Sequence, residues 1–462
     1  MTKMTLRDNK LGGRIPAELG EKLTSLVAIS LRNNSLTGPI PASLANLSHV
    51  QYLDLSTNQL VGSIPSGLGL VKSMSYLDLA ENLLTGMVPP SLYNMSSLEY
   101  FYVGANMLYG SIPNDIGSKF PKLKILILSI NHFTGTIPSS ISNISSLTDL
   151  HLKYNRFSGH VPSTLGKLRA LQVLNFGYNK LEADPYKGWE FITCLVNCSQ
   201  LQQLALHSNS FGGQRPGSIV NLSTTLQQLY LMDNRVSGVI PADIGNLVGL
   251  ETLAIANTSM YGVIPESIGK LENLVVLGLY NNTLSGLIPP SLGNLSQLSV
   301  LDCIYGNLEG PIPASLGELK KLTVLDFSSH YYLNGSIPRE IFKLPSLSWY
   351  LDLSYNSLSG PLPNELGSLA NINKLVLSGN RLSGKIPDSI QNCVVLEWLS
   401  LDNSLFEGSI PRSLTDIKGL RLLNLTMNKF SGNIPDALGN IGNLQDLYLA
   451  DNNLSGSIPL VL

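Results

Sequence analysis

Residues 53–74 read "LDLSTNQLVGSIPSGLGLVKSM", and this stretch contains the unit from which the whole chain is built. Its template is L-x-L-x-x-N-x-L-x-G-x-I-P-x-x-L-G-x-L-x-x-L. The chain of 462 residues holds 19 copies, and all steps between them but one are 24 or 25 residues long. The exception is the step of 30 residues from Asn179 to Asn209. The copies are aligned on the Asn of the template, which we call the anchor. Four copies carry another residue there, namely Thr258, Gly306, Tyr331 and Ser404.

A repeat of this length predicts a stack of small units that share one core, as in a leucine-rich-repeat solenoid. Leu53 and Leu55 alternate as in a strand with one buried face, and each strand must pair with that of the next copy. The Asn amide can donate and accept at the turn that leaves each strand. Gly-x-Ile-Pro predicts a second extended segment, followed by a short helical turn.

The expected fold class is therefore α/β, a leucine-rich-repeat solenoid of about 19 repeats. We expect a concave parallel β-sheet, short 3-10 or α turns on the convex side, and a superhelical twist. Residues 1–462 are expected to form one array that is uncapped at both ends, because neither end carries a capping segment. The chain is accordingly expected to be a piece of something longer.

Composition argues against several classes of function. Charged residues make up 13% of the chain and the formal net charge is −2, so a nucleic acid or an anionic membrane is not an expected partner. Apolar residues never run unbroken for the length of a membrane span. The six histidines are scattered over the copies, and no catalytic constellation stands out. We therefore expect no enzyme activity and no cofactor.

The full template resembles the plant-specific class of leucine-rich repeats, and Gly-x-x-Pro occurs in 18 of the 19 copies. The chain is similar to the ectodomain of a plant leucine-rich-repeat receptor-like kinase. The stretch "GWEFITCLVNCSQLQQLALHSNSFGG" resembles a grass immune-receptor subgroup related to the flagellin and elongation-factor receptors. The resemblance implies a peptide or protein ligand, a co-receptor with a shorter repeat ectodomain, and the extracellular side of the plasma membrane. The family's kinase domain, membrane span and cysteine-paired cap have no counterpart in this chain.

The long step predicts an inserted loop over residues 180–200, pinned by Trp189 and Phe191. Cys194 and Cys198 could meet on a helix, but two ligands without nearby partners make no zinc site. Cys198, Cys303 and Cys393 occupy leucine positions, which indicates buried thiols. We expect a scaffolding loop here and no metal site.

Residues that flank the two strand leucines are not dictated by the template and should point out of the concave face. Tyr and Trp there offer a large contact area with a polar handle, although Tyr also simply favours strands. An Asp recurs between the two strand leucines of several copies, as Asp54 and Asp78 do, and is expected to be exposed to solvent. The predicted first patch is Tyr52, Tyr76, Tyr100, Tyr102, Asp149, His151, Lys153, Tyr154, Tyr178, His207, Tyr230 and Asp233. The predicted second patch is Asp302, Tyr305, Asp326, Asp352, Tyr355, Lys374, Trp398 and Asp402.

Twelve Asn-x-Ser/Thr sequons favour the first patch as the ligand site. No sequon falls on the expected concave face from about Tyr52 to Asp233, whereas glycans on Asn257, Asn281 and Asn424 would obstruct that face. The predicted glycosylation sites are Asn46, Asn94, Asn143, Asn221, Asn294 and Asn334.

Two other functions remain open at the level of the sequence. The chain could be a secreted repeat protein that inhibits a pathogen's cell-wall-degrading enzyme, a role that needs no kinase. It could also be a truncated, non-functional receptor fragment, because uncapped ends expose core leucines.

Overall fold

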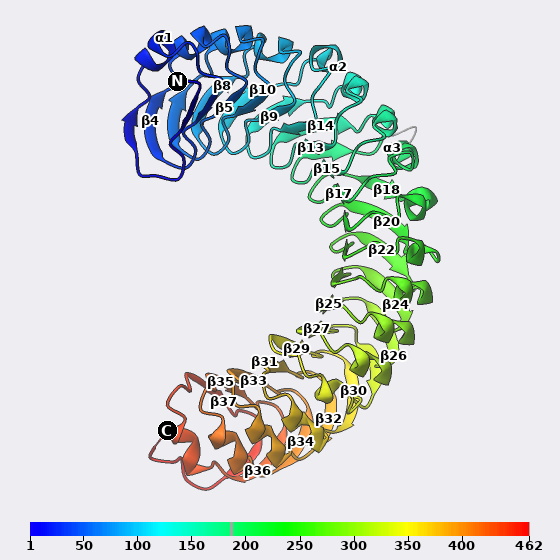
Figure 1. Cartoon of the computed structure of the whole chain (residues 1–462). Helices are drawn as coiled ribbons and strands as arrows, with labels where there is room; N and C mark the ends of the chain where they lie inside the picture. Colours follow the sequence, from blue (N-terminus) through cyan, green and yellow to red (C-terminus); the bar gives the residue numbers. More distant parts are fainter. Residues whose placement is uncertain (185–187, 462) are drawn as a thin grey trace. The chain divides into compact units, whose positions relative to one another are not determined.

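The computed structural model describes residues 1–184 and 188–461, which form two compact units, Met1–Val236 and Ser237–Leu462. In each unit every repeat adds one short strand to a main sheet, and nearly every repeat adds a second strand to a flank sheet and a short helix on the opposite side (Figure 1). The predicted solenoid of parallel strands is confirmed in both units. That the two units form a single array stays a prediction.

The main sheet of the first unit consists of parallel strands in sequence order, each three residues long. The central leucines lie in register from one strand to the next, as Leu53 does with Leu77, and both are fully buried or nearly so. This column of leucines is the core that no repeat can form alone. The strands are β1 (Lys3–Thr5), β3 (Ala28–Ser30), β5 (Tyr52–Asp54), β7 (Tyr76–Asp78), β9 (Tyr100–Tyr102), β11 (Ile125–Ile127), β13 (Asp149–His151), β15 (Val173–Asn175), β17 (Gln203–Ala205) and β19 (Gln228–Tyr230).

The flank sheet of the first unit is built by the segments that contain the glycine of Gly-x-Ile-Pro. Gly62 has a φ of 79°, in the left-handed region that residues with a Cβ seldom adopt. The parallel strands are β2 (Gly12–Arg14), β4 (Ser35–Pro39), β6 (Gln59–Gly62), β8 (Leu83–Met87), β10 (Met107–Gly110), β12 (His132–Gly135), β14 (Arg156–His160) and β16 (Lys180–Glu182), at which this sheet ends. β18 (Gly212–Gln214) follows the interruption, and β20 (Arg235–Val239) lies at the boundary of the two units.

Short helices line the side away from the main sheet, mostly single 3-10 turns. The glycine at the Leu-Gly position of the template is required by close approach. In the repeat with Ile116 and Gly117 at this position, a Cβ on Gly117 would lie 1.8 Å from the carbonyl oxygen of Ser140 in the next repeat. The helices of the first unit are α1 (Glu18–Lys22), η1 (Ala42–Asn46), η2 (Ser66–Leu70), η3 (Leu92–Asn94), α2 (Ile116–Lys119), η4 (Ser139–Asn143), η5 (Ser163–Lys167), α3 (Glu190–Leu195) and η6 (Gly217–Asn221).

The second unit repeats the same three layers. Its main sheet is β21 (Thr252–Ala254), β23 (Val276–Gly278), β25 (Val300–Asp302), β27 (Val324–Asp326), β29 (Tyr350–Asp352), β31 (Lys374–Val376), β33 (Trp398–Ser400), β35 (Leu422–Asn424) and β37 (Asp446–Tyr448). Its flank strands are β22 (Ser259–Gly262), β24 (Thr283–Leu287), β26 (Asn307–Pro311), β28 (Tyr332–Gly335), β30 (Ser357–Pro361), β32 (Arg381–Gly384), β34 (Leu405–Gly408), β36 (Lys429–Asn433) and β38 (Asn453–Ser455). Its helices are η7 (Ile244–Asn246), η8 (Glu266–Lys270), η9 (Pro290–Asn294), η10 (Ala314–Glu318), η11 (Ile341–Lys343), η12 (Asn364–Ser368), η13 (Asp388–Asn392), η14 (Arg412–Asp416) and η15 (Asp436–Asn440).

The anchor asparagines form a ladder of hydrogen bonds between repeats. The side-chain amide of Asn58 donates to the carbonyls of Leu31, one repeat earlier, at 3.0 Å and of Leu55 at 3.2 Å. Its oxygen accepts the backbone N–H of Leu36 at 3.0 Å. The predicted role of the Asn at the turn is thereby confirmed. The residue before the anchor adopts a positive φ throughout, as Thr57 does at 54°, a feature that the template does not reveal.

One anchor is corrected by the structure: His330, and not Tyr331, occupies the Asn position. The His330 ring is fully buried, its Nδ1 accepts the N–H of Leu308 at 3.2 Å, and its Nε2 lies 2.5 Å from the carbonyl of Cys303. A neutral imidazole that donates from Nε2 reproduces both halves of the Asn interaction. The next step, from His330 to Asn356, is therefore 26 residues, so two repeats and not one depart from the period.

After Asn179 the chain still forms the short flank strand β16, and the longer segment that follows it packs through aromatic side chains. Trp189 and Phe191 are buried against Phe211, with ring centroids 5.2 and 5.8 Å from it, and the Trp189 indole N–H donates to the carbonyl of Gly212 at 3.0 Å. That the loop serves only as a scaffold stays a prediction, and residues 185–187 of the loop lie outside the described part. Cys198, like Cys303 and Cys393, is buried as a small hydrophobic side chain.

Candidate functional site: two aromatic clusters on the main sheet

The N-terminal tyrosine cluster consists of Tyr52, Tyr76, Tyr100 and Tyr102 on strands β5, β7 and β9. The rings of Tyr52 and Tyr76 stack with centroids 4.3 Å apart and an interplanar angle of 15°. Tyr76 also lies 5.7 Å from Tyr100 and 5.4 Å from Tyr102. Because the strands are in register, three successive repeats bring these rings into one half-buried surface.

Two carboxylates lie beneath this cluster. Asp54 and Asp78 are only 2% and 8% exposed, so the expectation of solvated carboxylates is wrong for them. The hydroxyls of Tyr52 and Tyr76 donate to them at 3.3 Å. Burial raises the pKa of Asp78 to about 6, and the Asp54 carboxylate adds to the effect. The floor of the cluster therefore gains negative charge as the pH rises through the mildly acidic range.

Tyr102 belongs to the same cluster and is affected by the Asp78 carboxylate. Its pKa rises to about 12 because of burial, with Asp78 as the second cause. The Tyr102 hydroxyl therefore stays protonated at neutral pH and can donate a hydrogen bond to a ligand.

The central aromatic cluster consists of Tyr154, Tyr178, His207 and Tyr230. Tyr154 and Tyr178 stack at 4.0 Å and 9°. The His207 ring meets Tyr178 edge-on at 5.2 Å and lies 5.7 Å from Tyr230. Tyr154 and Tyr178 both have positive φ and lie in the turns that follow the strands, not on the strands themselves.

Gly177 makes room for the His207 ring, because a Cβ at Gly177 would lie 2.5 Å from that ring. Burial lowers the pKa of His207, and the nearby Lys153 contributes in the same direction while Asp233 opposes it. The imidazole is therefore neutral over a wider pH range than a free histidine.

Polar residues of the first patch lie between the two clusters. Asp149 and His151 share strand β13, with 3.9 Å between the carboxylate and Nε2. Burial alone would raise the pKa of Asp149, but hydrogen bonds from His151 and Thr148 outweigh it, so the pKa is lowered. The first predicted patch thus resolves into two aromatic clusters with a charged segment between them.

The second predicted patch is organised around a column of carboxylates in the second unit. Asp302, Asp326 and Asp352 lie in register on β25, β27 and β29. Asp326 is 4% exposed and accepts hydrogen bonds from the N–H and hydroxyl of Ser328. Burial, together with the charges of Asp352 and Asp302, raises the pKa of Asp326 to about 7. The template predicts that Asp326 is exposed on the concave face, but its carboxylate is buried and already hydrogen-bonded to Ser328.

The remaining residues of the second patch lie apart from this column. Tyr305 and Tyr355 are exposed in turns with positive φ, and the Lys374 ammonium lies 5.6 Å from the centre of the Trp398 ring. Asp402 accepts a hydrogen bond from the Ser400 hydroxyl at 2.9 Å. This patch has no stacked aromatic surface comparable to that of the first unit among its described residues.

The raised pKa of Asp326 predicts a pH dependence of stability. The folded-state pKa, about 7, exceeds the value of about 4 expected for the unfolded chain, so the folded state binds more protons between these limits. The free energy of unfolding should therefore fall as the pH rises from about 4 to about 7. In Asp326→Asn this fall should be shallower, because the amide keeps the acceptor but does not ionise. Denaturant titrations across this range measure the difference, and equal slopes would contradict the prediction.

The six predicted glycosylation sites are exposed and lie away from the main sheets. Asn46, Asn94, Asn143, Asn221 and Asn294 are each the last residue of a short helix, and Asn334 lies in flank strand β28. Glycans there would leave both aromatic clusters open. Whether these residues are glycosylated stays a prediction.

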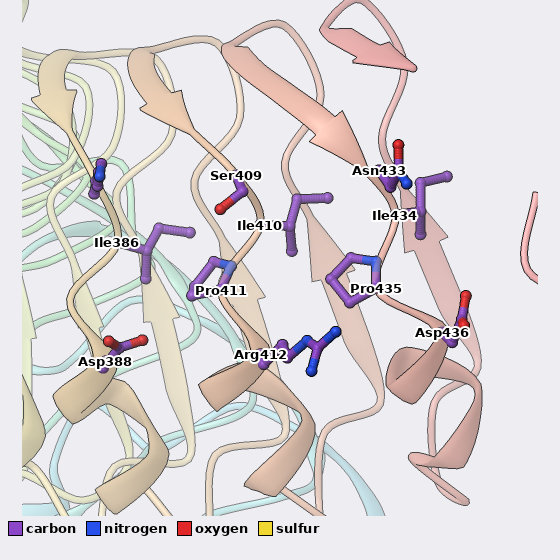
Figure 2. Close-up of a pocket in the computed structure, with 11 residues that line it drawn as sticks. Ile386, Asp388, Ser409, Ile410, Pro411, Arg412, Asn433, Ile434, Pro435 and Asp436 are labelled. Carbon is purple, nitrogen blue, oxygen red and sulfur yellow. The ribbon is translucent and has the colours of Figure 1, made fainter. Parts of the chain in front are cut away.

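A hollow of about 520 Å³ lies on the flank of the second unit, along three successive Gly-x-Ile-Pro segments (Figure 2). Asp388, Arg412 and Asp436 lie along one side of it, and Ser409 and Asn433 along the other. The Ile and Pro residues of its walls are template residues, its polar residues stand at variable positions, and no predicted site residue lines it. We therefore assign it to the architecture of the repeat.

The described residues contain no group of His, Cys, Asp and Glu side chains that could hold a metal ion. Within residues 1–184 and 188–461, no helix is long and apolar enough to cross a membrane.

Three leucine-rich-repeat models match the chain. The model described as a leucine-rich repeat region matches residues 217–335, and a second repeat model matches residues 1–60 and 121–181. A third matches residues 349–369, 371–393, 419–441 and 443–462.

Among curated proteins, the LRR receptor-like serine/threonine-protein kinase EFR of Arabidopsis thaliana is 48% identical over 88 residues. The receptor kinase-like protein Xa21 of Oryza sativa subsp. japonica is 46% identical over 90 residues. These segments cover 19% and 20% of this chain but only 8% and 9% of the two relatives. The matches therefore span a small part of each relative.

Two solved structures cover nearly the whole chain. The ectodomain of the Arabidopsis receptor kinase HAESA, solved with an extended IDA peptide hormone, has a TM-score of 0.92 and 32% identity. It matches 99% of this chain and 76% of its own. The plant peptide hormone receptor RGFR1, in complex with RGF2, has a TM-score of 0.74 and 29% identity over 99% of this chain and 91% of its own. The chain belongs to the leucine-rich-repeat family of plant receptor-kinase ectodomains.

Proposed function

We propose that this chain is the extracellular ligand-recognition region of a plant receptor-like kinase, and that it binds a peptide or protein ligand on the main sheet of its first unit. The observation that carries the proposal is the pair of aromatic clusters, in which neighbouring rings lie 4.0 to 5.7 Å apart across successive repeats. Preorganised aromatic surfaces with polar tips are typical of protein-binding hot spots.

The arrangement supports an extended ligand that crosses the strands. The two clusters offer apolar contact, and Asp149, His151 and Lys153 between them offer charges of both signs. An extended peptide laid across the strands can place side chains on both clusters and polar groups on the segment between them. HAESA has been solved with a peptide hormone and with the co-receptor SERK1. By analogy, we infer that ligand binding here recruits a co-receptor with a shorter repeat ectodomain.

The test is the capture of secreted plant peptides on the immobilised chain, followed by titration of the synthetic peptide. The variant that combines Tyr76→Ala, Tyr100→Ala, Lys153→Ala and Tyr154→Ala should lose about 100-fold or more in affinity, because each truncation removes a contact of hot-spot type. Tyr109→Ala is the matched control, since Tyr109 is 51% exposed on the flank sheet of the same unit. Retained binding by the fourfold variant, or no peptide bound by the natural chain, would contradict the proposal.

A further inference from the structure

Trp349 is the most exposed tryptophan of the chain, with 71% of its surface accessible, compared with 45% for Trp398 and 4% for Trp189. It lies directly before strand β29 in the second unit, outside the residues discussed above. An exposed indole offers a partner a large apolar face together with a polar N–H group.

A one-residue insertion places Trp349 outside the template. Elsewhere two residues separate the last leucine before a strand from the strand's central leucine, as between Leu298 and Leu301. Here three residues separate Leu347 from Leu351, and both leucines are buried. Because both anchors stay in the core, the additional residue has to bulge outward.

The backbone beneath the bulge is held on both sides. The N–H of Trp349 donates to the carbonyl of Thr323 at 3.0 Å, and its own carbonyl accepts the N–H of Lys374 at 3.1 Å. The carbonyl of Ser348 accepts the N–H of Asn373 at 2.8 Å. The indole is thus attached at the start of a strand that is hydrogen-bonded on both sides, which is a rigid support for a binding group.

The indole borders a hollow of about 360 Å³ that is lined by Ser348, Trp349 and Asn373. The hollow therefore combines one flat apolar face with a hydroxyl and a side-chain amide, and no charged side chain lines it. A buried apolar peptide side chain needs a pocket lined mainly by apolar groups. A pyranose ring, in contrast, has a face of C–H groups and a rim of hydroxyls, and it matches an indole flanked by neutral hydrogen-bonding groups.

We propose that Trp349, Ser348 and Asn373 form a subsite for a neutral sugar ring, which stacks on the indole and hydrogen-bonds to the hydroxyl and the amide. The ring can come from a free cell-wall oligosaccharide or from an N-glycan of a partner protein. This subsite lies in the second unit, so it does not depend on the peptide site proposed for the first.

The experiment titrates the whole chain with three probes: cellohexaose, xylohexaose and a free oligomannose N-glycan. Tryptophan fluorescence and its quenching by acrylamide report on the exposed indole, and calorimetry measures affinity. At least one probe should bind saturably and protect Trp349 from the quencher. Binding of a hexaose assigns the cell-wall source, and binding of the N-glycan alone assigns the glycoprotein source.

Variants separate the subsite from general adhesion of sugars. Trp349→Ala should weaken binding by about 10-fold or more, as expected for loss of a stacking platform, and should leave thermal unfolding unchanged because the side chain is exposed. Asn373→Ala should weaken binding to a smaller extent. Tyr332→Ala is the matched control, since Tyr332 is 61% exposed near the other insertion between His330 and Asn356, and it should bind as the natural chain does.

Three results would overturn the proposal. None of the probes binds, or Trp349→Ala binds as tightly as the natural chain, or only an unglycosylated protein partner protects Trp349 from the quencher. None of these results affects peptide binding by the first unit, so the two proposals can fail separately.

Discussion

Gly117→Ala is expected to destabilise the first unit by about 3 kcal/mol or more. The added Cβ would lie 1.8 Å from the carbonyl oxygen of Ser140 and 2.9 Å from the Cβ of Asn143. The nearer atom belongs to the backbone of the next repeat, and the position of an alanine Cβ is fixed by its own backbone. No side-chain rotation can therefore relieve the clash. Relief requires the two turns to separate, which opens the core that adjacent repeats share.

Chemical denaturation monitored by circular dichroism measures this effect. Gly217→Ala is the matched control, because no heavy atom lies within 4 Å of a Cβ built there, and its effect should stay within about 0.5 kcal/mol. If the two variants unfold at the same denaturant concentration, close approach is not the reason for the glycine at this template position.

Asn82→Ala is expected to cost about 3 to 5 kcal/mol, because it leaves several buried backbone groups without a partner. Asn82 is 6% exposed; its oxygen accepts the N–H of Leu60 at 3.0 Å, and its amide donates to the carbonyls of Leu55 at 3.1 Å and Leu79 at 3.2 Å. Alanine can replace neither the acceptor nor the donor in this buried position.

A second variant tests whether the ladder needs asparagine itself or any side chain that both donates and accepts a hydrogen bond. Asn82→His should retain more stability than Asn82→Ala, since His330 performs the same two roles in its own repeat. Asn371→Ala, at an exposed asparagine, serves as the control and should change the free energy of unfolding little. An Asn82→Ala variant as stable as this control would refute the ladder as a source of stability.

Much of the fold follows from the template alone. Alternating leucines such as Leu53 and Leu55 have only one way to be buried, which is in a strand paired with copies of itself. Asn58 is predictable for a related reason, because a side chain that both donates and accepts recurs where the chain leaves each strand. The interruption at Trp189 and Phe191 is also readable, since a loop that keeps buried aromatic residues keeps the core closed.

The template assigns Tyr331 to the Asn position, whereas the structure places His330 there. The spacing of the copies contains a sign of this difference. The distance from His330 to Asn356 exceeds the usual step by two residues, and one of these is Trp349. An imidazole can replace an amide only if its tautomer and its neighbours fit, and such a fit is a property of the packed turn. The left-handed conformation before each anchor was missed because many different residue types adopt it there.

The amino-acid sequence by itself determined the repeat, the strand and turn order, the ladder and the set of variable positions, because these depend on contacts that recur with the period. The tertiary structure alone decided how the variable positions act together: which tyrosines stack, that Asp78 and Asp326 are buried, and that Trp349 stands out of the sheet edge. These properties depend on how side chains from different repeats fill the space between them. That packing is set by distances across strands, which no single repeat encodes.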